Sequence, residues 1–291
     1  MNSMTVFIIL NYLTVDETLE SVRQIKKMMN SGLQIIIIDN ASPNGAGVML
    51  ERALRSDPQV RVVQNKENSG FAQGNNLGYR IAKEYNPEFI VMQNNDIEYT
   101  QVNFLDLVKQ EFDRSNFDIL GPDIFVPETG IHQNPKKKSS YSISEIKHLV
   151  NESEKKFNRK KLLRIRVLLK RITFLRKLVL QWEQRKRKNL WKEPLTGAIL
   201  HGSCLIFSKS FINNIAEPFD PRTFFYFETE ILDLRIKRRG LVSCYTPKIK
   251  VMHHQNTSTK MASKDEFEKT NFQLKNMIRS GKVAETYLKK Q

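Results

Sequence analysis

A cluster of oxygen-bearing side chains directly follows one apolar run. Residues 89–92 read FIVM, and the next four positions are Gln93, Asn94, Asn95 and Asp96. A hairpin turn here would favour Asn-Gly or Asp-Gly, and neither is present. Asp96 is a candidate ligand for a hard divalent cation, because such a cation beside phosphates uses one or two carboxylates and takes its other oxygens from water and substrate. The alternative is that Asp96 only caps the following turn.

Three other apolar runs in the first half of the chain also end in polar side chains. These are Asn11, Asp39 followed by Asn40, and Asn65. A single Asn or Asp after a strand is commonly part of a turn or a helix cap. Several such ends at one edge of a parallel sheet favour a site instead, because ligands of open α/β sheets bind outside the carboxyl ends of the strands.

Alternating apolar runs and helical patterns must position these residues. Short runs rich in β-branched residues predict strands at 5–10, 34–39, 60–65, 88–93 and 117–122. Apolar spacing of three and four predicts helices at 15–29, 47–55, 70–85 and 102–112. Continuous apolar strands are typical of a sheet buried on both faces, so the first 125 residues predict an α/β fold with a parallel sheet.

The part of the chain after residue 195 predicts shorter elements. We expect a strand and a helix within 195–215, then a loop leading into a helix that ends at Gly240. A short strand and a loop that carries His253 and His254 follow, and the polar segment 265–290 predicts a C-terminal helix.

The stretch 65–79, NKENSGFAQGNNLGY, is rich in glycine and asparagine. Gly70, Gly74 and Gly78 are spaced by four, which on a helix permits close approach either to the sheet or to a diphosphate, and the spacing favours neither. The stretch is not a G-x-G-x-x-G fingerprint and follows the third strand rather than the first. A nicotinamide cofactor is therefore disfavoured.

The composition is that of a globular protein with unevenly distributed charge. The chain has 291 residues and a formal net charge of +16, and nearly all of the positive excess lies between Lys136 and Leu195. The two cysteines argue against a disulfide framework and favour a reducing compartment. No apolar run reaches the roughly 18 residues of a membrane span, and the N-terminal residues lack the features of a signal peptide.

Residues 159–188 form the most basic stretch of the chain. Apolar side chains recur there at helical spacing, and Arg or Lys fills most of the other face. Three interpretations are open: a helix lying in an anionic membrane interface, a helix binding nucleic acid, or a solvated helix covering the rest of the protein.

Five motifs, taken in chain order, resemble a known enzyme family. They are FIILNY, IIIIDNAS, NSGFAQGNNLGY, VMQNNDI and FFYFETEILDLRIKRRGL. Together they look like a bacterial family 2 glycosyltransferase of the GT-A fold, in the rhamnosyl- and galactosyltransferase-like group of capsule, O-antigen and cell-wall polysaccharide synthesis. The resemblance covers roughly 5–125 and 196–260. It implies a Rossmann-like mixed sheet of the nucleotide-diphospho-sugar transferase type.

The resemblance also implies a division of the chain. Residues 1–135 and 194–262 would form the catalytic domain, with the nucleotide-sugar half first and the acceptor half second. Residues 136–193 would be a basic amphipathic helical insertion, and 263–291 a C-terminal helical tail.

The first half, by this resemblance, would bind the nucleotide sugar. Asp39 would contact the nucleoside, with Asn11 beside it. The other residues assigned to donor binding are Asn68, Gly70, Asn75, Asn94 and Asn95.

The resemblance places a metal site at two residues. Asp96 matches the second acid of the family's D-x-D motif, whereas Asn94 stands where the family has the first acid. His253 falls on the histidine that ends the family's C-terminal strand. A carboxylate with an imidazole suits Mn²⁺ as well as Mg²⁺, so a divalent cation of either kind is expected.

The catalytic base and the acceptor site are expected in the second half. Thr229 stands where the family has its catalytic Asp, and Thr cannot act as a general base at neutral pH. Glu228 and Glu230 flank it, and either is a candidate, although both are also ordinary first-turn acids. The acceptor would contact the residues that match the strand beneath it, which are His201, Gly202 and Ser203.

These features predict an inverting, metal-dependent glycosyltransferase. The expected donor is a UDP- or dTDP-sugar, and the expected acceptor is a glycan carried on a polyprenyl diphosphate. This context favours a cytoplasmic protein that binds the inner face of the plasma membrane through 159–188 and does not bind nucleic acid. The alternatives are a nucleotidyltransferase of similar fold, disfavoured by the absence of a basic Gly-rich loop near the first strand, and a basic nucleic-acid-binding protein.

Overall fold

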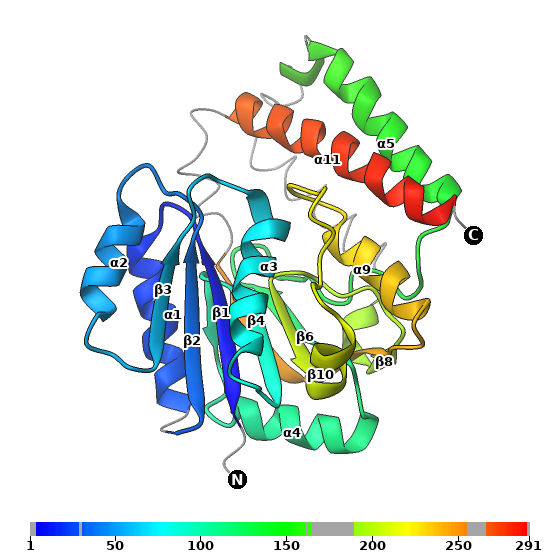
Figure 1. The fold of residues 1–291 in the computed structure, drawn as a ribbon. Helices are drawn as coiled ribbons and strands as arrows, with labels where there is room; N and C mark the ends of the chain where they lie inside the picture. The colour runs from blue at the N-terminus through cyan, green and yellow to red at the C-terminus, as the bar shows by residue number, and fades with distance from the viewer. Residues whose placement is uncertain (1–3, 29–30, 161, 165–188, 255–265, 290–291) are drawn as a thin grey trace.

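A mixed β-sheet forms the centre of the computed structural model, which describes residues 4–28, 31–160, 162–164, 189–254 and 266–289 (Figure 1). The strands follow the order β3-β2-β1-β4-β9-β6-β10-β5, with β7 beside β6 and β8 beside β10. Their bounds are β1 (Thr5–Asn11), β2 (Leu33–Asp39), β3 (Val60–Gln64), β4 (Phe89–Asn94), β5 (Ile97–Tyr99), β6 (Ile119–Val126), β7 (Ile131–His132), β8 (Leu195–Thr196), β9 (Cys204–Ser208) and β10 (Ser243–His253).

Strands β3, β2, β1 and β4 are parallel, as the sequence predicts. Strands β1 and β2 are buried along almost their whole length, because helices cover both faces of the sheet. The pairing sets Asn11 beside Asp39, and Leu10 beside Asn94. The carboxyl ends of β1, β2 and β4 therefore meet at one edge of the sheet.

The other half of the sheet mixes strand directions and corrects two of the predicted strands. β6 spans Ile119 to Val126 and so extends past the predicted end at residue 122. The extension forms because the pairing of β6 with β10 continues after a register shift. β10 is longer than the short strand predicted, and His253 is its last residue rather than part of a loop. Antiparallel pairing with β5, which sets His253 beside Ile97, extends β10 to this point.

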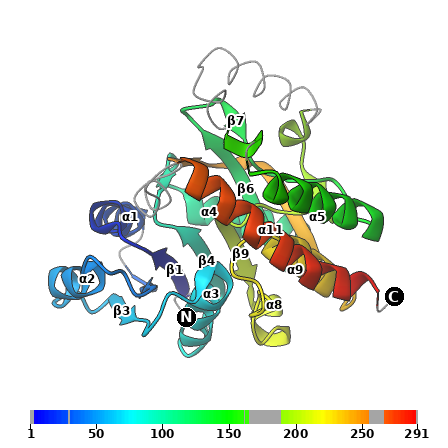
Figure 2. The ribbon, with the colours of Figure 1, turned by 90° about the horizontal axis from the view of Figure 1, so that it is seen from above.

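Helices form a layer on each face of the sheet (Figure 2). One layer holds α1 (Val15–Met28), α2 (Ala46–Leu54) and α4 (Phe104–Ser115), whose apolar faces pack on side chains such as Phe7 and Ile35. The opposite layer holds α3 (Gly70–Lys83), α8 (Lys209–Asn214) and α9 (Glu228–Lys237), which pack on side chains such as Ile8 and Phe207.

Helices α5 (Ile143–Asn158) and α11 (Glu266–Leu288) lie side by side over α9 (Figures 1 and 2). A third apolar cluster, which includes Val150, Ile231 and Ala284, joins the three helices. The start of the predicted insertion and the predicted tail thus pack together on the helix that carries Glu228 and Glu230. The domain boundaries themselves stay a prediction.

The predicted membrane-binding stretch 159–188 lies mostly outside the described residues, which include only 159, 160 and 162–164 of it. Within the part of the chain that the structure describes, no helix is both long and apolar enough to cross a bilayer.

Candidate active site

Asp39 lies at the carboxyl end of β2 with both carboxylate oxygens occupied by neighbours. Oδ1 accepts hydrogen bonds from Asn11 Nδ2 (2.6 Å) and from Ser42 Oγ (2.6 Å), and Oδ2 accepts one from the Ser42 backbone N–H (3.0 Å). These bonds hold the buried carboxylate rigidly at the sheet edge. Asn11 and Asp39, predicted as neighbours, are in direct contact.

Asn95 connects the turn after β4 to the start of α1. Its Nδ2 lies 2.5 Å from Thr14 Oγ1, 2.9 Å from Thr18 Oγ1 and 3.3 Å from Asn11 Oδ1. The side chain is almost fully buried. These contacts anchor the turn that presents the next residue, Asp96, and the predicted contact of Asn95 with the donor stays a prediction.

Asp96 and His253 face each other across the pairing of β5 with β10. Oδ1 of Asp96 lies 3.1 Å from Nε2 of His253, and the backbone N–H of His254 donates to the Asp96 carbonyl (3.0 Å). The Nδ1 of His253 lies 2.6 Å from Gln133 Oε1. Because an amide oxygen only accepts, Nδ1 carries the hydrogen in this arrangement, and Nε2 is the ring nitrogen that faces Asp96.

This arrangement fits a bound cation. Asp96 Oδ1 is buried and has no hydrogen-bond donor among the described residues, and Nε2 of His253 lies 3.1 Å from it, so two potential ligand atoms lie together. Asn94 adds a neutral amide, with Nδ2 3.4 Å from His253 Nε2. Within the described ranges, no group of three or more His, Cys, Asp or Glu side chains is arranged to hold a metal. A cation here would take its remaining ligands from water and from the substrate.

A cavity of about 560 Å³ opens beside Asp96. Acidic side chains of α1 and β5 contribute to its wall, together with His254. His254 Nε2 lies 2.5 Å from Glu98 Oε2, and this hydrogen bond raises the pKa of the imidazole above its ordinary value. An anionic substrate entering from this side would meet negative charge, which a cation at Asp96 would offset.

Asn40 organises the loop between β3 and α3. Its Nδ2 donates to Asn68 Oδ1 (3.0 Å) and to the Gly70 carbonyl (3.1 Å), and its Oδ1 accepts from Asn65 Nδ2 (2.9 Å). Gly70 has φ +77°, and a Cβ added there would lie 2.5 Å from the Phe224 carbonyl oxygen. Gly70 therefore permits the close approach of the segment 220–227 to α3.

The rest of the glycine spacing on α3 serves the packing of the helix on the sheet. A Cβ at Gly74 would lie 2.6 Å from Leu10, and one at Gly78 would lie 2.5 Å from Ile8. Asn75 is buried on the same helix, where its Nδ2 donates to the Phe71 carbonyl (3.0 Å) while its Oδ1 has no donor among the described residues. Donor contacts of Asn68, Gly70 and Asn75 stay predictions.

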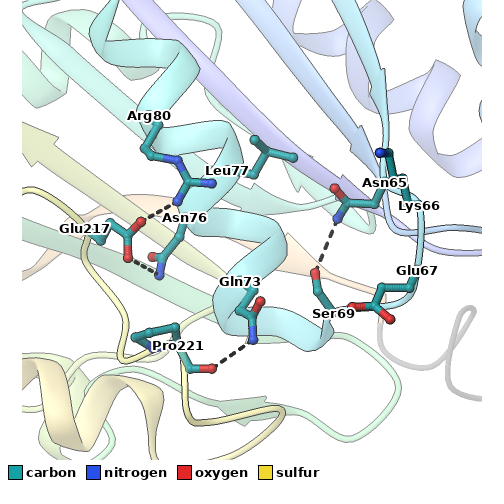
Figure 3. A pocket seen from close by; sticks show the side chains of 10 residues that line it. All are labelled: Asn65, Lys66, Glu67, Ser69, Gln73, Asn76, Leu77, Arg80, Glu217 and Pro221. Atoms are coloured by element: carbon teal, nitrogen blue, oxygen red, sulfur yellow. Dashed lines mark hydrogen bonds and ion pairs between the residues drawn. The ribbon is translucent and has the colours of Figure 1, made fainter.

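A second recess, of about 310 Å³, lies between α3 and the segment 217–221 (Figure 3). Most of the polar side chains around it bond to one another. Arg80 forms an ion pair with Glu217, Asn76 Nδ2 lies 3.3 Å from the same carboxylate, and Gln73 donates to the Pro221 carbonyl (3.0 Å). These contacts fasten the segment to α3.

The predicted acceptor residues lie between the Asp96–His253 pair and the start of α9. The rings of His201 and His253 have centroids 6.2 Å apart, and His201 Nδ1 lies 2.9 Å from Ser203 Oγ. A Cβ at Gly202 would be 3.4 Å from Thr229 Cγ2. The structure thus places the predicted metal, acceptor and base residues in one continuous region.

Helix α9 begins after two residues in the left-handed conformation. Tyr226 (φ +71°) and Phe227 (φ +65°) both adopt the left-handed backbone conformation, which residues other than glycine normally avoid. Each costs about 1 kcal/mol or more in conformational free energy. The segment is held in place because Phe227 is buried against α5 and α11, and Ser280 Oγ donates to the Phe225 carbonyl (2.7 Å). This strained entry buries the first-turn acids of α9.

Glu228 and Glu230 have different surroundings although they share one helical turn. Glu230 forms an ion pair with Lys136, whose Nζ also lies 3.2 Å from Thr229 Oγ1. Glu228 is 7% exposed, and its Oε1 has no donor among the described residues. Burial raises the pKa of Glu228 to about 7; the charge of Glu230 adds to the rise, and Lys136 opposes it.

No sequence pattern singles out Gln133 or Lys136. Gln133 is an isolated amide in a segment with no periodicity, and Lys136 is the first of three consecutive lysines. Neither carries a motif, and only the fold brings them to His253 and Glu230.

Three comparisons place the chain among known proteins. Residues 6–213 match the family described as "Glycosyl transferase family 2". Over 109 residues the chain is 26% identical to "Glycosyltransferase GlyG" of Streptococcus pneumoniae serotype 4 (strain ATCC BAA-334 / TIGR4). That alignment covers 38% of this chain and 35% of the relative, so it spans about a third of the curated protein.

Similar solved structures share the fold at low sequence identity. GalNAc-T7, solved with UDP, GalNAc and Mn²⁺, has a TM-score of 0.60 and 14% identity, and the match covers 87% of this chain and 44% of that one. The mannosyltransferase PcManGT of Pyrobaculum calidifontis, solved with GDP-Man and Mn²⁺, has a TM-score of 0.55 and 10% identity over 100% and 74% of the two chains. S. aureus TarS 1-349 with UDP-GlcNAc has a TM-score of 0.53 and 11% identity over 98% and 70%. These neighbours confirm the predicted GT-A fold.

Proposed function

Because the chain belongs to glycosyl transferase family 2, we propose that it transfers a sugar from a nucleoside diphosphate sugar to a hydroxyl group of an acceptor, with inversion at the anomeric carbon. The observation that carries the proposal is the Asp96–His253 pair at the sheet edge, where the buried Asp96 Oδ1 has no hydrogen-bond donor among the described residues. Asn95 and Asn11 connect this pair to the Asp39 carboxylate. An activated sugar bound there would have its diphosphate at the cation site and its anomeric carbon toward the acceptor.

Asp96 and His253 would hold a divalent cation, Mn²⁺ or Mg²⁺. When bound, the cation offsets the negative charge that develops on the leaving diphosphate. Gln133 orients His253 by accepting its Nδ1 hydrogen, which keeps Nε2 available as a ligand atom. The GalNAc-T7 and PcManGT structures were solved with Mn²⁺, which supports a divalent cation in a fold of this kind.

The chemical step needs a carboxylate on the acceptor side. The acceptor hydroxyl attacks the anomeric carbon while the bond from that carbon to the diphosphate oxygen breaks, and the leaving nucleotide keeps the electron pair. The hydroxyl proton passes to a carboxylate of α9, either Glu228 or Glu230, which must lie within hydrogen-bond reach of the hydroxyl. His201, Gly202 and Ser203 would line the acceptor side.

For the substrates, we propose a UDP- or dTDP-sugar as donor and a polyprenyl-diphosphate-linked glycan as acceptor, in bacterial surface polysaccharide synthesis. The similarity to TarS, solved with UDP-GlcNAc, supports a uridine donor. Attachment to an anionic membrane surface through 159–188, at the cytoplasmic face, belongs to the same proposal and is supported by the basic amphipathic sequence.

A thermal-shift experiment tests the donor proposal. The protein is heated with UDP-, dTDP- and GDP-sugars, each with Mn²⁺, with Mg²⁺ or with EDTA. A donor at one hundred times its Kd should stabilise the fold by about 2.7 kcal/mol, and only when the cation is present. Asp113→Asn, which removes an exposed acid of α4, serves as the control and should keep the shift. If no sugar nucleotide raises the Tm with either cation, the proposed function is wrong.

A further inference from the structure

Lys136 reaches α9 from a different part of the chain. Its backbone N–H donates to the Ile199 carbonyl (2.8 Å), which fixes the residue beside the segment that leads into His201, Gly202 and Ser203. Its ammonium forms an ion pair with Glu230 and lies 3.2 Å from Thr229 Oγ1. Lys136 is thus a cation placed by the tertiary structure at the first turn of α9.

Both carboxylate oxygens of Glu230 have partners. Oε1 faces the Lys136 ammonium, and Oε2 accepts a hydrogen bond from Thr229 Oγ1 (3.3 Å). To accept a proton from a substrate, Glu230 would have to release the ammonium and leave it partly buried without its anion, which is costly. Glu228 has no ion-pair partner among the described residues. Its carboxylate accepts hydrogen bonds from its own backbone N–H and from that of Tyr226, and its Oε1 is buried without a donor in the described part of the chain.

We infer that Lys136 is a positioning residue that keeps Glu230 as a paired carboxylate and leaves Glu228 as the proton acceptor. The inference rests on the proposed glycosyl transfer, and it resolves the choice between the two acids that the sequence leaves open. It also gives Thr229 a role, because its hydroxyl joins Lys136 to Glu230 at the position where the resembling family has an acid.

The charges around Glu228 fit its role as the proton acceptor. The titratable groups that act on it are Tyr226 from the preceding segment, Glu230 from its own helix, and Lys136 from the segment before α5. Glu230 opposes ionisation of Glu228, and Lys136 favours it. A general base is most effective when its pKa is close to the working pH, and the pKa of Glu228 near 7 meets that condition.

A titration followed by carboxyl ¹³C NMR tests the inference without any substrate. The full-length protein is labelled at the glutamate side-chain carboxyls, and the Glu228 and Glu230 signals are assigned by their loss in Glu228→Gln and Glu230→Gln. We expect the Glu228 midpoint to rise by about one pH unit in Lys136→Met and to fall by a similar amount in Glu230→Gln, because each change removes a charge of opposite sign. Lys136→Arg should behave like wild type.

Lys137→Met is the matched control. Lys137 is the next residue and forms its own ion pair with Glu145 of α5 (2.7 Å), so its loss removes an equal charge nearby. The Glu228 midpoint should not move in this variant. Equal shifts in the two lysine variants, or a wild-type Glu228 midpoint below 5, would overturn the inference whatever reaction the protein catalyses.

Turnover gives the second readout. With the sugar nucleotide that stabilises the wild-type protein, Glu228→Gln should lower kcat by 10²–10⁴-fold. Glu230→Gln should keep measurable turnover, with the acidic limb of the pH profile of kcat/KM moved to lower pH, and Lys136→Met should move that limb to higher pH. A Glu230→Gln variant as inactive as Glu228→Gln would overturn the inference. Absence of turnover in wild type with every donor would instead count against the proposed function.

Discussion

Nε2 of His253 lies 3.1 Å from Oδ1 of Asp96, because the last residue of β10 pairs beside Ile97 of β5. The two side chains come from distant parts of the chain, and Asp96 Oδ1 accepts no hydrogen bond from the described residues. Gln133 holds the imidazole so that Nε2 faces the Asp96 carboxylate oxygen. The approach of these two atoms makes this edge of the sheet suitable for binding a cation.

Removal of either side chain of the Asp96–His253 pair should weaken Mn²⁺ binding. Asp96→Asn keeps the shape but removes the charge, and His253→Ala removes the imidazole. Each should raise the Kd for Mn²⁺ at least tenfold and remove most of the transfer activity, because few protein ligands remain. Electron paramagnetic resonance measures free Mn²⁺ directly. The exposed change Asp113→Asn should leave the Kd unaltered, and unchanged binding in Asp96→Asn would show that the cation lies elsewhere.

Gln133 should affect the same site through His253. Gln133→Leu removes the acceptor for Nδ1, so the imidazole can rotate or change tautomer, and Mn²⁺ affinity should fall by 10–100-fold. Gln133→Glu retains an acceptor oxygen and should bind at least as well as wild type. The same Mn²⁺ titration distinguishes the two variants, with circular dichroism to verify that both are folded. Equal Mn²⁺ affinities in Gln133→Leu and Gln133→Glu would show that Gln133 does not contribute to the metal site.

Glu228 should make the protein less stable as the pH rises from about 4.5 to 7. Its folded pKa of about 7 lies above the ordinary value of 4.5, so the native state binds the extra proton in this range. Below this range the carboxyl is protonated in both states and carries no penalty. Above it, the ionised buried group costs about 3 kcal/mol, from 1.36 kcal/mol per pKa unit.

Glu228→Gln removes that titration. It should therefore raise the free energy of unfolding at pH 8 relative to wild type and have little effect at pH 4.5, as measured by urea denaturation. Asp113→Asn, which changes an exposed acid of α4, is the control and should change neither value. A Gln variant that gains no stability at pH 8 would contradict the raised pKa.

Gly70 and Gly45 form a matched pair for testing the contact between α3 and the segment 220–227. Both have φ +77°, but a Cβ at Gly45 meets nothing within 4 Å, whereas one at Gly70 would meet the Phe224 carbonyl oxygen at 2.5 Å. Gly45→Ala should cost about 1–2 kcal/mol from the backbone conformation alone. Gly70→Ala should cost at least about 1 kcal/mol more in urea unfolding, because the segment leading to α9 must move. Equal losses would show that this contact is loose.

Much of the fold could be predicted from the sequence because its signals are local. Buried parallel strands read as continuous apolar runs, and amphipathic helices repeat every three or four residues, so the helices and parallel strands up to Ser115 are recovered with small shifts at their ends. The short strand β5 was not predicted, because it forms by antiparallel pairing with the distant β10. The strand ends were less predictable in the second half, since β6 and β10 are extended by pairing with each other and β10 also by pairing with β5. Such pairing joins residues far apart in the chain and has no local signature.

The sequence by itself determined which residue types stand at the carboxyl ends of the strands, and hence the Asn11, Asp39 and Asp96 positions of the candidate site. Only the tertiary structure decided what those residues face. It brought Gln133 to His253 and Lys136 to Glu230, two pairs that carry no motif. The reason is physical: a side chain's identity and its local periodicity are written along the chain, whereas burial, ion pairing and the pKa of Glu228 arise from neighbours that folding brings together.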